Sequence, residues 1–330
     1  MGFDDILGNS RVKKTLRLAL EKNRVPNSLI FCGPKGVGKR SLARILAKAV
    51  NCERKKDDAC EECASCVAIA GRRLPDVWEV EPEGQFVKLK QMQALRQAAY
   101  LRPMVSRKRV FIVDDAEKMN EESSNCLLKV LEEPPLFSHI ILLTANPDLI
   151  LSTIKSRCQI LQFTPIGKEE ITRLLIEKGY PEDRAKIISL LVRGNVEEAL
   201  ELDWDEIQEK RQEAWNIFLS FLKKRDASAF VRNYAFGQRN IIWEDFERTL
   251  EILASFCRDF ILLKERGEPS FLLNPDYRKE IEALNKDWSL EKSCECLNRI
   301  ESAISGLSKH LNISLLVSSF YSLMGEGIHD

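Results

Sequence analysis

The stretch that decides the fold reads Gly33-Pro34-Lys35-Gly36-Val37-Gly38-Lys39-Arg40-Ser41. It follows the apolar run 29–32 and opens a helical pattern over 41–50. A glycine-rich turn between a strand and a helix is typical of a phosphate-binding loop, because backbone N–H groups and the helix N-terminus face the phosphates and the lysine reaches the outer ones. A chance glycine-rich turn is the alternative. The predicted nucleotide-binding positions in this stretch are Gly33, Gly36, Gly38, Lys39, Arg40 and Ser41.

The position after the loop lysine departs from the usual pattern. A Ser or Thr hydroxyl normally binds Mg²⁺ there, but this chain has Arg40, which offers only donors and a positive charge. Ser41 comes one residue later and is turned by about 100° around the helix. We therefore expect the loop to keep its fold while Mg²⁺-assisted hydrolysis is impaired.

Short apolar runs alternate with helical patterns on both sides of the loop. The other apolar runs are 77–80, 110–113, 140–143 and 159–163. The helical patterns are 11–22, 41–50, 89–99 and 123–132. Continuous apolar strands between helices are typical of a parallel sheet that is covered on both faces. These patterns predict an α/β fold with a parallel sheet over residues 1–165.

The apolar run 110–113 ends in two acids, Asp114 and Asp115. This is the form of a Walker B element, in which the first acid supports Mg²⁺ and a following carboxylate, usually Glu, orients the attacking water. Asp115 is one methylene shorter than Glu, and Glu117 is expected to lie in the next turn. We predict both aspartates as nucleotide-site residues, the alternative being a buried strand capped by solvated acids.

Four of the ten cysteines are clustered with the spacing C-x7-C-x2-C-x2-C. They are Cys52, Cys60, Cys63 and Cys66. Four thiolates at close spacing suit tetrahedral Zn²⁺ and leave no open position for water, which predicts a structural zinc module over 52–66. An iron–sulfur cluster and unligated thiols are the alternatives. The other six cysteines are dispersed and are expected to be reduced thiols in apolar surroundings.

Strand patterns nearly vanish after Pro165. Residues 166–205 have the pattern of short helices, which predicts a small helical lid domain. Residues 206–330 carry longer amphipathic helices over 215–222, 246–263 and 297–323, which predicts an all-α C-terminal domain.

The charge balance is neutral for the whole chain and uneven along it. The 330 residues contain 50 basic and 50 acidic side chains. Residues 1–160 hold 27 basic and 20 acidic residues (+7), and residues 161–330 hold 23 and 30 (−7). This is either chance scatter or a front half that faces phosphates. Neutrality argues against a protein that binds DNA alone, and the basic run Arg102, Arg107, Lys108 and Arg109 is either a solvated face or a contact to a DNA backbone.

Targeting segments are not expected. No apolar run reaches the length of a membrane span, and the first residues lack a basic region followed by a long apolar one. We therefore expect a cytoplasmic protein with no membrane partner.

Five features together resemble the clamp-loader subunits of bacterial DNA polymerase III, in the AAA+ superfamily. The phosphate loop and the four-cysteine insert are two of them. The other three are the stretches Ile6-Leu7-Gly8-Asn9, Leu127-Leu128-Lys129-Val130-Leu131-Glu132-Glu133-Pro134-Pro135 and Ser156-Arg157-Cys158. The resemblance covers 1–165 well, 166–203 fairly, and the C-terminal helices only by size and pattern.

The resemblance implies roles for three further residues. Arg157 is similar to the arginine finger, which reaches into a neighbouring subunit's ATP site and stabilises phosphate charge in trans. Asn146, at the end of the fourth strand, is similar to sensor 1. Glu197 stands where the ATPase subunits of the family place an arginine.

Arg40, Asp115 and Glu197 each depart from the ATPase pattern, while Arg157 is intact. This combination resembles the delta prime branch of the family, a mostly non-hydrolysing stator with absent or weak ATPase activity. The resemblance implies a collar role for 206–330, and gamma/tau and delta partners in a hetero-pentamer that loads the beta sliding clamp onto primer–template DNA. The implied cofactors are structural zinc and a nucleotide, ATP or ADP. An ATP-hydrolysing gamma/tau-like subunit is the alternative.

Overall fold

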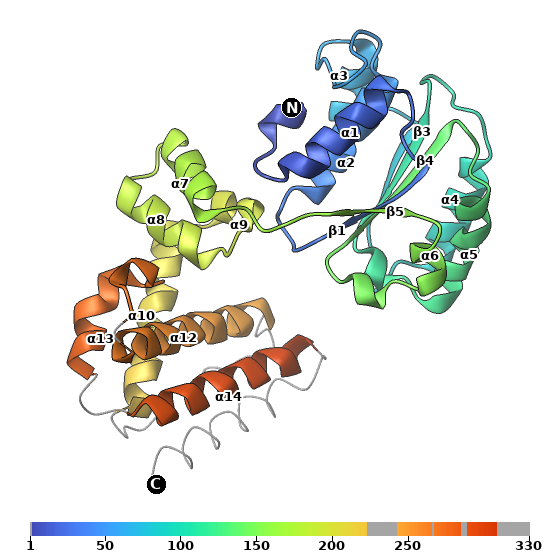
Figure 1. The fold of residues 1–330 in the computed structure, drawn as a ribbon. Coiled ribbons are helices and arrows are strands. Elements are labelled where there is room, and N and C mark those ends of the chain that lie inside the picture. Colours follow the sequence, from blue (N-terminus) through green and yellow to red (C-terminus); the bar gives the residue numbers. More distant parts are fainter. Residues whose placement is uncertain (1, 223–242, 266, 285–288, 309–330) are drawn as a thin grey trace. The chain divides into compact units, whose positions relative to one another are not determined.

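The structure is a computed structural model that describes residues 2–222, 243–265, 267–284 and 289–308 (Figure 1). The chain divides into two compact units, each treated by itself below. The first comprises Met1–Tyr180 and Val192–Glu201, and the second Pro181–Leu191 and Leu202–Asp330.

The first unit is built on a five-stranded parallel sheet with the order β2-β3-β4-β1-β5. Its strands are β1 Ser28–Cys32, β2 Val77–Val80, β3 Arg109–Val113, β4 Ser138–Thr144 and β5 Gln159–Gln162. Every residue of β1, β3 and β4 is buried, as their continuous apolar character predicts. The five predicted strands and the parallel α/β fold are confirmed.

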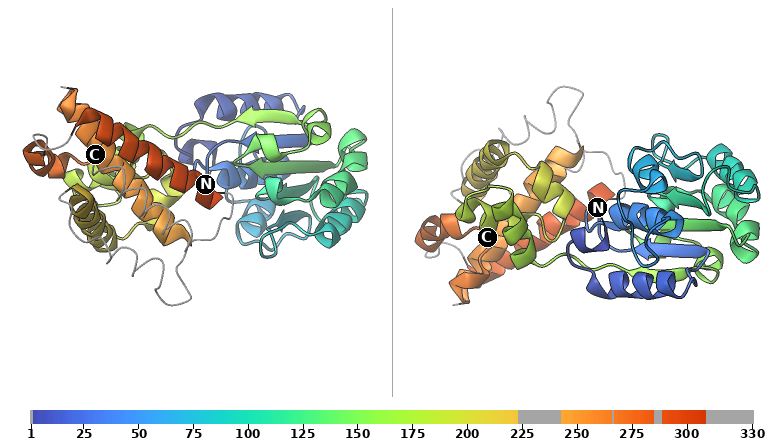
Figure 2. Two further views of the ribbon diagram at one scale, coloured as in Figure 1. Left: turned by 90° about the horizontal axis from the view of Figure 1, so that it is seen from below. Right: turned by 90° about the horizontal axis from the view of Figure 1, so that it is seen from above.

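Helices cover both faces of this sheet, in Figure 1 and in the two further views of Figure 2. On one face lie α1 (Ser10–Glu21) and α2 (Lys39–Asn51), whose apolar side chains share a core with Phe31 and Ile112. On the other lie α4 (Leu89–Ala99), α5 (Glu121–Glu132) and α6 (Ser152–Lys155), which share a core with Phe111. Alternate side chains of one strand therefore enter opposite cores.

Short elements connect these layers. Helix α3 (Ala64–Ala70) follows the cysteine-rich loop and packs on α2. The 3₁₀ turns are η1 (Phe3–Asp5), η2 (Ala116–Lys118) and η3 (Pro147–Leu149). Beyond β5, α7 (Lys168–Glu177) and α9 (Val196–Glu201) pack together within the first unit.

The region predicted as a lid, 166–205, is therefore divided between the two units. Its middle helix, α8 (Glu182–Leu191), belongs to the second unit with the C-terminal helices. The physical reason is packing: Leu191 and Trp204 contact the C-terminal core, and the Arg184 guanidinium lies 5.3 Å from the Trp204 ring centroid.

The second unit is all-α in its described residues. Its longer helices are α10 (Trp204–Leu222), α12 (Trp243–Lys264) and α14 (Leu290–Ser308), joined by α13 (Arg278–Leu284) and the turns η4 (Pro269–Phe271) and η5 (Pro275–Tyr277). Trp215, Phe218 and Phe256 form the aromatic centre of the core. All three predicted helices begin earlier than expected, at 204, 243 and 290. Residues 309–323 of the third prediction lie outside the described residues.

Candidate functional site

The phosphate loop lies where the sequence places it, between β1 and α2 (Figure 1). Gly36 (φ 68°) and Gly38 (φ 85°) adopt the left-handed conformation that glycine tolerates at low cost. A Cβ at Gly36 would overlap the Asn195 side chain, and Val196 N donates to Gly36 O at 2.9 Å. The segment 195–196 therefore lies directly on the loop, in contact with its backbone.

Lys39 is held by the loop itself. Its Nζ donates to Gly33 O and to Pro34 O, each at 2.6 Å. Burial lowers the pKa of the Lys39 ammonium, and the nearby carboxylates of Glu117 and Asp114 oppose that shift. The lysine that would reach the phosphates of a nucleotide thus bonds to carbonyl oxygens of its own loop.

Arg40 lies among three carboxylates. Its Nη1 is 3.5 Å from Asp114 Oδ2, its Nε is 3.7 Å from Glu79 Oε2, and its Nη2 donates to Glu81 Oε1. Parallel strands end at one edge of a sheet, which brings the ends of β2 and β3 to the first turn of α2. Asp114, predicted as a nucleotide-site acid, is therefore paired with an arginine of its own chain.

Glu79 is shared with a second arginine. Arg44 Nε and Nη2 form a two-point contact with the Glu79 carboxylate at 2.7 and 2.6 Å. Burial opposes ionisation of Glu79, but Arg44, Arg72 and Arg40 outweigh it and lower the pKa of this carboxyl. Glu79 is thus held in its ionised form, and the three acids around Arg40 are paired with arginines of their own chain.

The two other acids of the predicted Walker B region face different ways. Asp115 (φ 43°) accepts from Lys118 Nζ at 2.6 Å, within its own turn. Glu117 does lie in the next turn, η2, but its Oε1 accepts from Ala145 N at 3.0 Å, at the end of β4. Its Oε2 is buried without a hydrogen-bond partner. Glu117, rather than Asp115, therefore reaches the neighbouring strand.

Asn146 and Glu197 belong to two separate elements, the turn η3 after β4 and helix α9. Asn146 follows β4, and its Oδ1 caps η3 by accepting from Asp148 N at 3.3 Å. Glu197 is exposed in the first turn of α9. Ser41 is half-buried, at the third position of α2.

The sequence predictions missed Glu79, Glu81 and Glu117 as parts of this edge. Glu79 and Glu81 alternate with Val80 at the end of the second apolar run. Acids at the end of a parallel strand indicate the edge where ligands bind, so this pattern could have predicted them as site residues. Glu117 gave no comparable signal, because its reach depends on the tight turn after Asp115.

Arg157 lies just after α6 and is anchored in its own chain. Its Nε donates to Glu132 Oε1 at 2.8 Å and its Nη2 contacts the same oxygen. Nη1 donates to Thr153 O at 2.8 Å. The side chain remains 32% exposed. Glu132 belongs to the Leu-Glu-Glu-Pro-Pro stretch, so two of the family-like segments meet at this ion pair.

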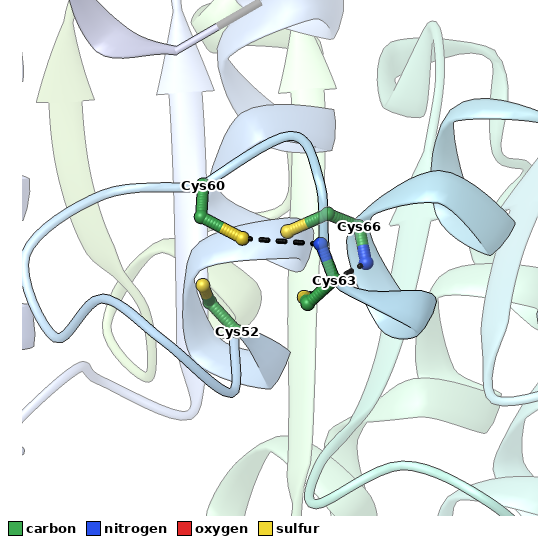
Figure 3. A group of neighbouring side chains, drawn as sticks. All are labelled: Cys52, Cys60, Cys63 and Cys66. Carbon is green, nitrogen blue, oxygen red and sulfur yellow. Dashed lines mark hydrogen bonds between the residues drawn. The ribbon is translucent and has the colours of Figure 1, made fainter.

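The four clustered cysteines converge on one point (Figure 3). Their sulfur atoms all lie within 4.8 Å of one another. Cys52 ends α2, Cys60 lies in the loop, Cys63 caps α3, and Cys66 lies in its first turn. Among the residues that the structure describes, this is the cluster of His, Cys, Asp or Glu side chains with metal-binding geometry.

Backbone donors support the thiol cluster. Cys63 N donates to Cys60 Sγ at 3.3 Å, Cys66 N to Cys63 Sγ at 3.4 Å, and Lys55 N to Cys52 Sγ at 3.3 Å. The Glu62 N–H and other donors lower the pKa of Cys60 to about 6, whereas burial raises that of Cys66 to about 12. Four sulfur ligands with N–H···S support fit a closed tetrahedral site, so the residues are compatible with structural zinc.

The described residues contain no helix long and apolar enough to cross a membrane.

Comparisons with known proteins extend over most of the chain. A model described as "DNA polymerase III, delta subunit" matches residues 8–167, and one for the C-terminal part of the delta subunit matches 206–320. DNA polymerase III subunit delta' of Bacillus subtilis is 35% identical over 221 residues, which cover 67% of each chain. The tau subunit of the same organism is 34% identical over 211 residues, or 61% of this chain and 37% of the relative.

A solved structure gives a further comparison. A gamma subunit-related protein of Thermotoga maritima aligns with 96% of this chain and 99% of its own at a TM-score of 0.44 and 15% identity. The family matches and the delta' relative are the findings that decide membership. The chain belongs to the family of DNA polymerase III clamp-loader subunits, on its delta prime branch.

Proposed function

We propose that this chain is a mostly non-hydrolysing stator of the clamp loader, which completes a neighbouring subunit's ATP site in trans with Arg157. Its own ATPase activity is absent or weak in this proposal. The observation that carries the first part is the position of Arg40, whose guanidinium contacts Asp114 where hydrolysing loops hold Mg²⁺.

The remaining groups of the edge support the same conclusion. Asp115, which would have to orient water, is bonded to Lys118 instead. Glu197 offers a carboxylate where an arginine would bind phosphate. Gly33, Gly36, Gly38 and Lys39 keep the loop competent to hold phosphate, so nucleotide binding without hydrolysis fits the residues.

The trans role rests on Arg157. A planar guanidinium presents donors in a fixed fork that matches phosphate oxygens. The contact with Glu132 orients this fork, and the exposed third of the side chain leaves it accessible to a partner. Placed against a neighbour's γ-phosphate, it would stabilise the charge of the transition state.

The test is Arg157→Ala, measured in the isolated chain and in the reconstituted loader. An arginine finger contributes about 10³-fold or more to hydrolysis at its site, so the loader should lose most of that site's share of turnover. Arg157→Lys should lose nearly as much, because lysine lacks the fork.

Arg54→Ala is the matched control. Arg54 is an exposed arginine of the same unit in an ion pair with Glu62, so its loss should leave ATPase activity unchanged. Full ATPase and clamp-loading activity of a loader that contains Arg157→Ala would contradict the proposal.

The partners follow from the family. We propose gamma/tau and delta as neighbours in a hetero-pentamer, with residues 206–330 as the collar and with 1–165 and 166–205 as the nucleotide-type and lid domains. The beta sliding clamp and primer–template DNA are the proposed targets of the assembly, and the cytoplasm is its proposed location. Co-purification of the full chain from native extract, with identification of the bound subunits, tests the partner set.

A gamma/tau-like ATPase is the second candidate, favoured by the 34% identity to the tau subunit. The intact Lys39 is the residue it would require. Turnover of ATP by the purified chain, lost on Lys39→Ala, would favour this candidate over the stator.

A further inference from the structure

A phosphate loop of this type normally combines three sources of positive potential. These are the backbone N–H groups, the loop lysine, and a Mg²⁺ held between a hydroxyl after the lysine and an acid at the end of a nearby strand. The first two are present here. At the third, the hydroxyl is replaced by Arg40, and the acid Asp114 lies 3.5 Å from the guanidinium.

The donor set around this position does not fit Mg²⁺. The ion prefers oxygen ligands in octahedral geometry, and Arg40 contributes only N–H donors and a positive charge. Glu79 and Glu81 do not restore the site, because the same guanidinium contacts both, and Arg44 binds Glu79 at two points. A dication placed among these acids would face Arg40 at short range.

The charges at this edge are already balanced without a metal. Arg40, Arg44 and Arg72 approach Glu79, Glu81 and Asp114, three cations against three anions. Lys118 is paired with Asp115. Glu117 is the remaining acid near Lys39, and its charge opposes the lowering of the Lys39 pKa by burial. Neutralised carboxylates no longer repel an anion at the loop.

We propose that the Arg40 guanidinium takes the place of Mg²⁺, so that this chain binds a nucleoside diphosphate without a divalent cation. Lys39 would exchange its bonds to Gly33 O and Pro34 O for phosphate oxygens, and Arg40 would present its fork beside them. Because Arg40 is already paired with carboxylates, it adds less positive charge beside the phosphates than Mg²⁺ would. The diphosphate, with one negative charge fewer than the triphosphate, is therefore the better match.

This inference rests on the proposed lack of hydrolysis but is tested separately from it. The full chain is titrated with N-methylanthraniloyl-ADP, once with Mg²⁺ and once with EDTA at a concentration that leaves zinc content unchanged. We expect saturable binding in EDTA and no gain in affinity from Mg²⁺. Arg40→Ser should weaken binding in EDTA by about tenfold or more, and Mg²⁺ should restore part of that loss.

Arg54→Ser is the matched control, since Arg54 is an exposed arginine of the same unit that pairs with Glu62, outside the group of charges around Arg40. The affinity of this variant for the ADP analogue should equal that of wild type. Zinc content and thermal unfolding verify that each variant is folded. If Arg40→Ser does not fold, the wild-type titration alone decides.

A tenfold gain in wild-type affinity from Mg²⁺, or no saturable binding in either buffer, would overturn the inference. Tighter binding of the ATP analogue than of the ADP analogue in EDTA would overturn the diphosphate assignment. None of these results changes what is expected of Arg157 in the assembled loader.

Discussion

Arg40 and Arg157 differ in the carboxylates that they contact and, in our proposal, in their roles. Arg40 contacts carboxylates of its own chain, whereas Arg157 is tied to Glu132 and remains a third exposed. One residue type therefore has two roles. Arg40 occupies the Mg²⁺ position of this chain's own phosphate loop, and Arg157, in our proposal, completes the ATP site of a neighbouring subunit. The difference lies in the neighbours: three carboxylates surround Arg40, and a single carboxylate orients Arg157.

Buried charges in the C-terminal unit give a residue-scale prediction about stability. The Arg211 side chain is fully buried and bonds both oxygens of Asp276, at 2.8 and 2.7 Å. Asp276→Ala should lower the free energy of unfolding by about 2–4 kcal/mol, because it leaves a buried cation with less compensation. Urea denaturation of the variant and of wild type measures this change in the free energy of unfolding.

Glu282→Ala is the control for that variant, since the Glu282–Arg278 pair is exposed and should contribute less than about 0.5 kcal/mol. Equal losses in the two variants would contradict the assignment.

Asp76 gives a pH-dependent prediction in the first unit. Burial alone would raise its pKa, but N–H donors of Ser106, Val105 and Met104 outweigh burial and hold the pKa well below the usual range. A depressed folded-state pKa contributes stability above the unfolded value of about 4, which is lost as pH falls toward the folded value.

Asp76→Asn should therefore lower the free energy of unfolding by about 2 kcal/mol at pH 7, and the gap to wild type should narrow below about pH 4. Chemical denaturation across this pH range measures the difference in stability between the two proteins. Loss of metal in acid affects both proteins alike, so it does not change this difference. A gap that stays constant from neutral to acidic pH would show that the charge is not the cause. Exposed Asp57→Asn is the control.

At the scale of elements, the cysteine module predicts bound metal. We expect about one zinc per chain, because four convergent sulfurs complete a tetrahedral shell. Cys66→Ser should remove most of the zinc and loosen 52–70, because Cys66 is fully buried beside α2. Elemental analysis and hydrogen exchange of this segment measure both effects. Cys126→Ser, outside the cluster, should retain the metal. A zinc-free wild type of unaltered stability would contradict a structural metal site.

The elements of the sheet were predictable because each has its own local signal. The run Val110 to Val113 is apolar at every position, and a strand buried on both faces needs that pattern. The phosphate loop was predictable from glycine spacing, and the cysteine cluster from ligand spacing. The four sulfur atoms lie close together in the structure (Figure 3), as the spacing of the cysteines predicts.

Contacts between distant elements were less predictable. Arg40 was recognised as a departure, but its partners Glu79 and Glu81 lie about 40 positions away and meet it only because β2 ends beside α2. The direction of Glu117 depends on the left-handed conformation of Asp115. The grouping of α8 with the C-terminal helices depends on packing of Leu191, which no local pattern indicates.

At the scale of the whole molecule, the neutral total is a sum of two unlike halves. The excess of basic residues lies in 1–160, with the phosphate loop and Arg157, and the excess of acids lies in 161–330. A zero sum therefore excludes neither phosphate contacts in the first unit nor assembly through the second. It argues only against strong binding of DNA by the isolated chain.

The central claim is that this chain contributes to ATP hydrolysis at a neighbour's site and not at its own. The most direct test compares Lys39→Ala and Arg157→Ala of this chain in otherwise identical reconstituted loaders, with clamp- and DNA-stimulated ATP turnover as the measurement. The account predicts turnover near wild type for Lys39→Ala and loss of one site's share for Arg157→Ala, since an arginine finger is worth about 10³-fold or more at its site. Loss with Lys39→Ala and none with Arg157→Ala would contradict it.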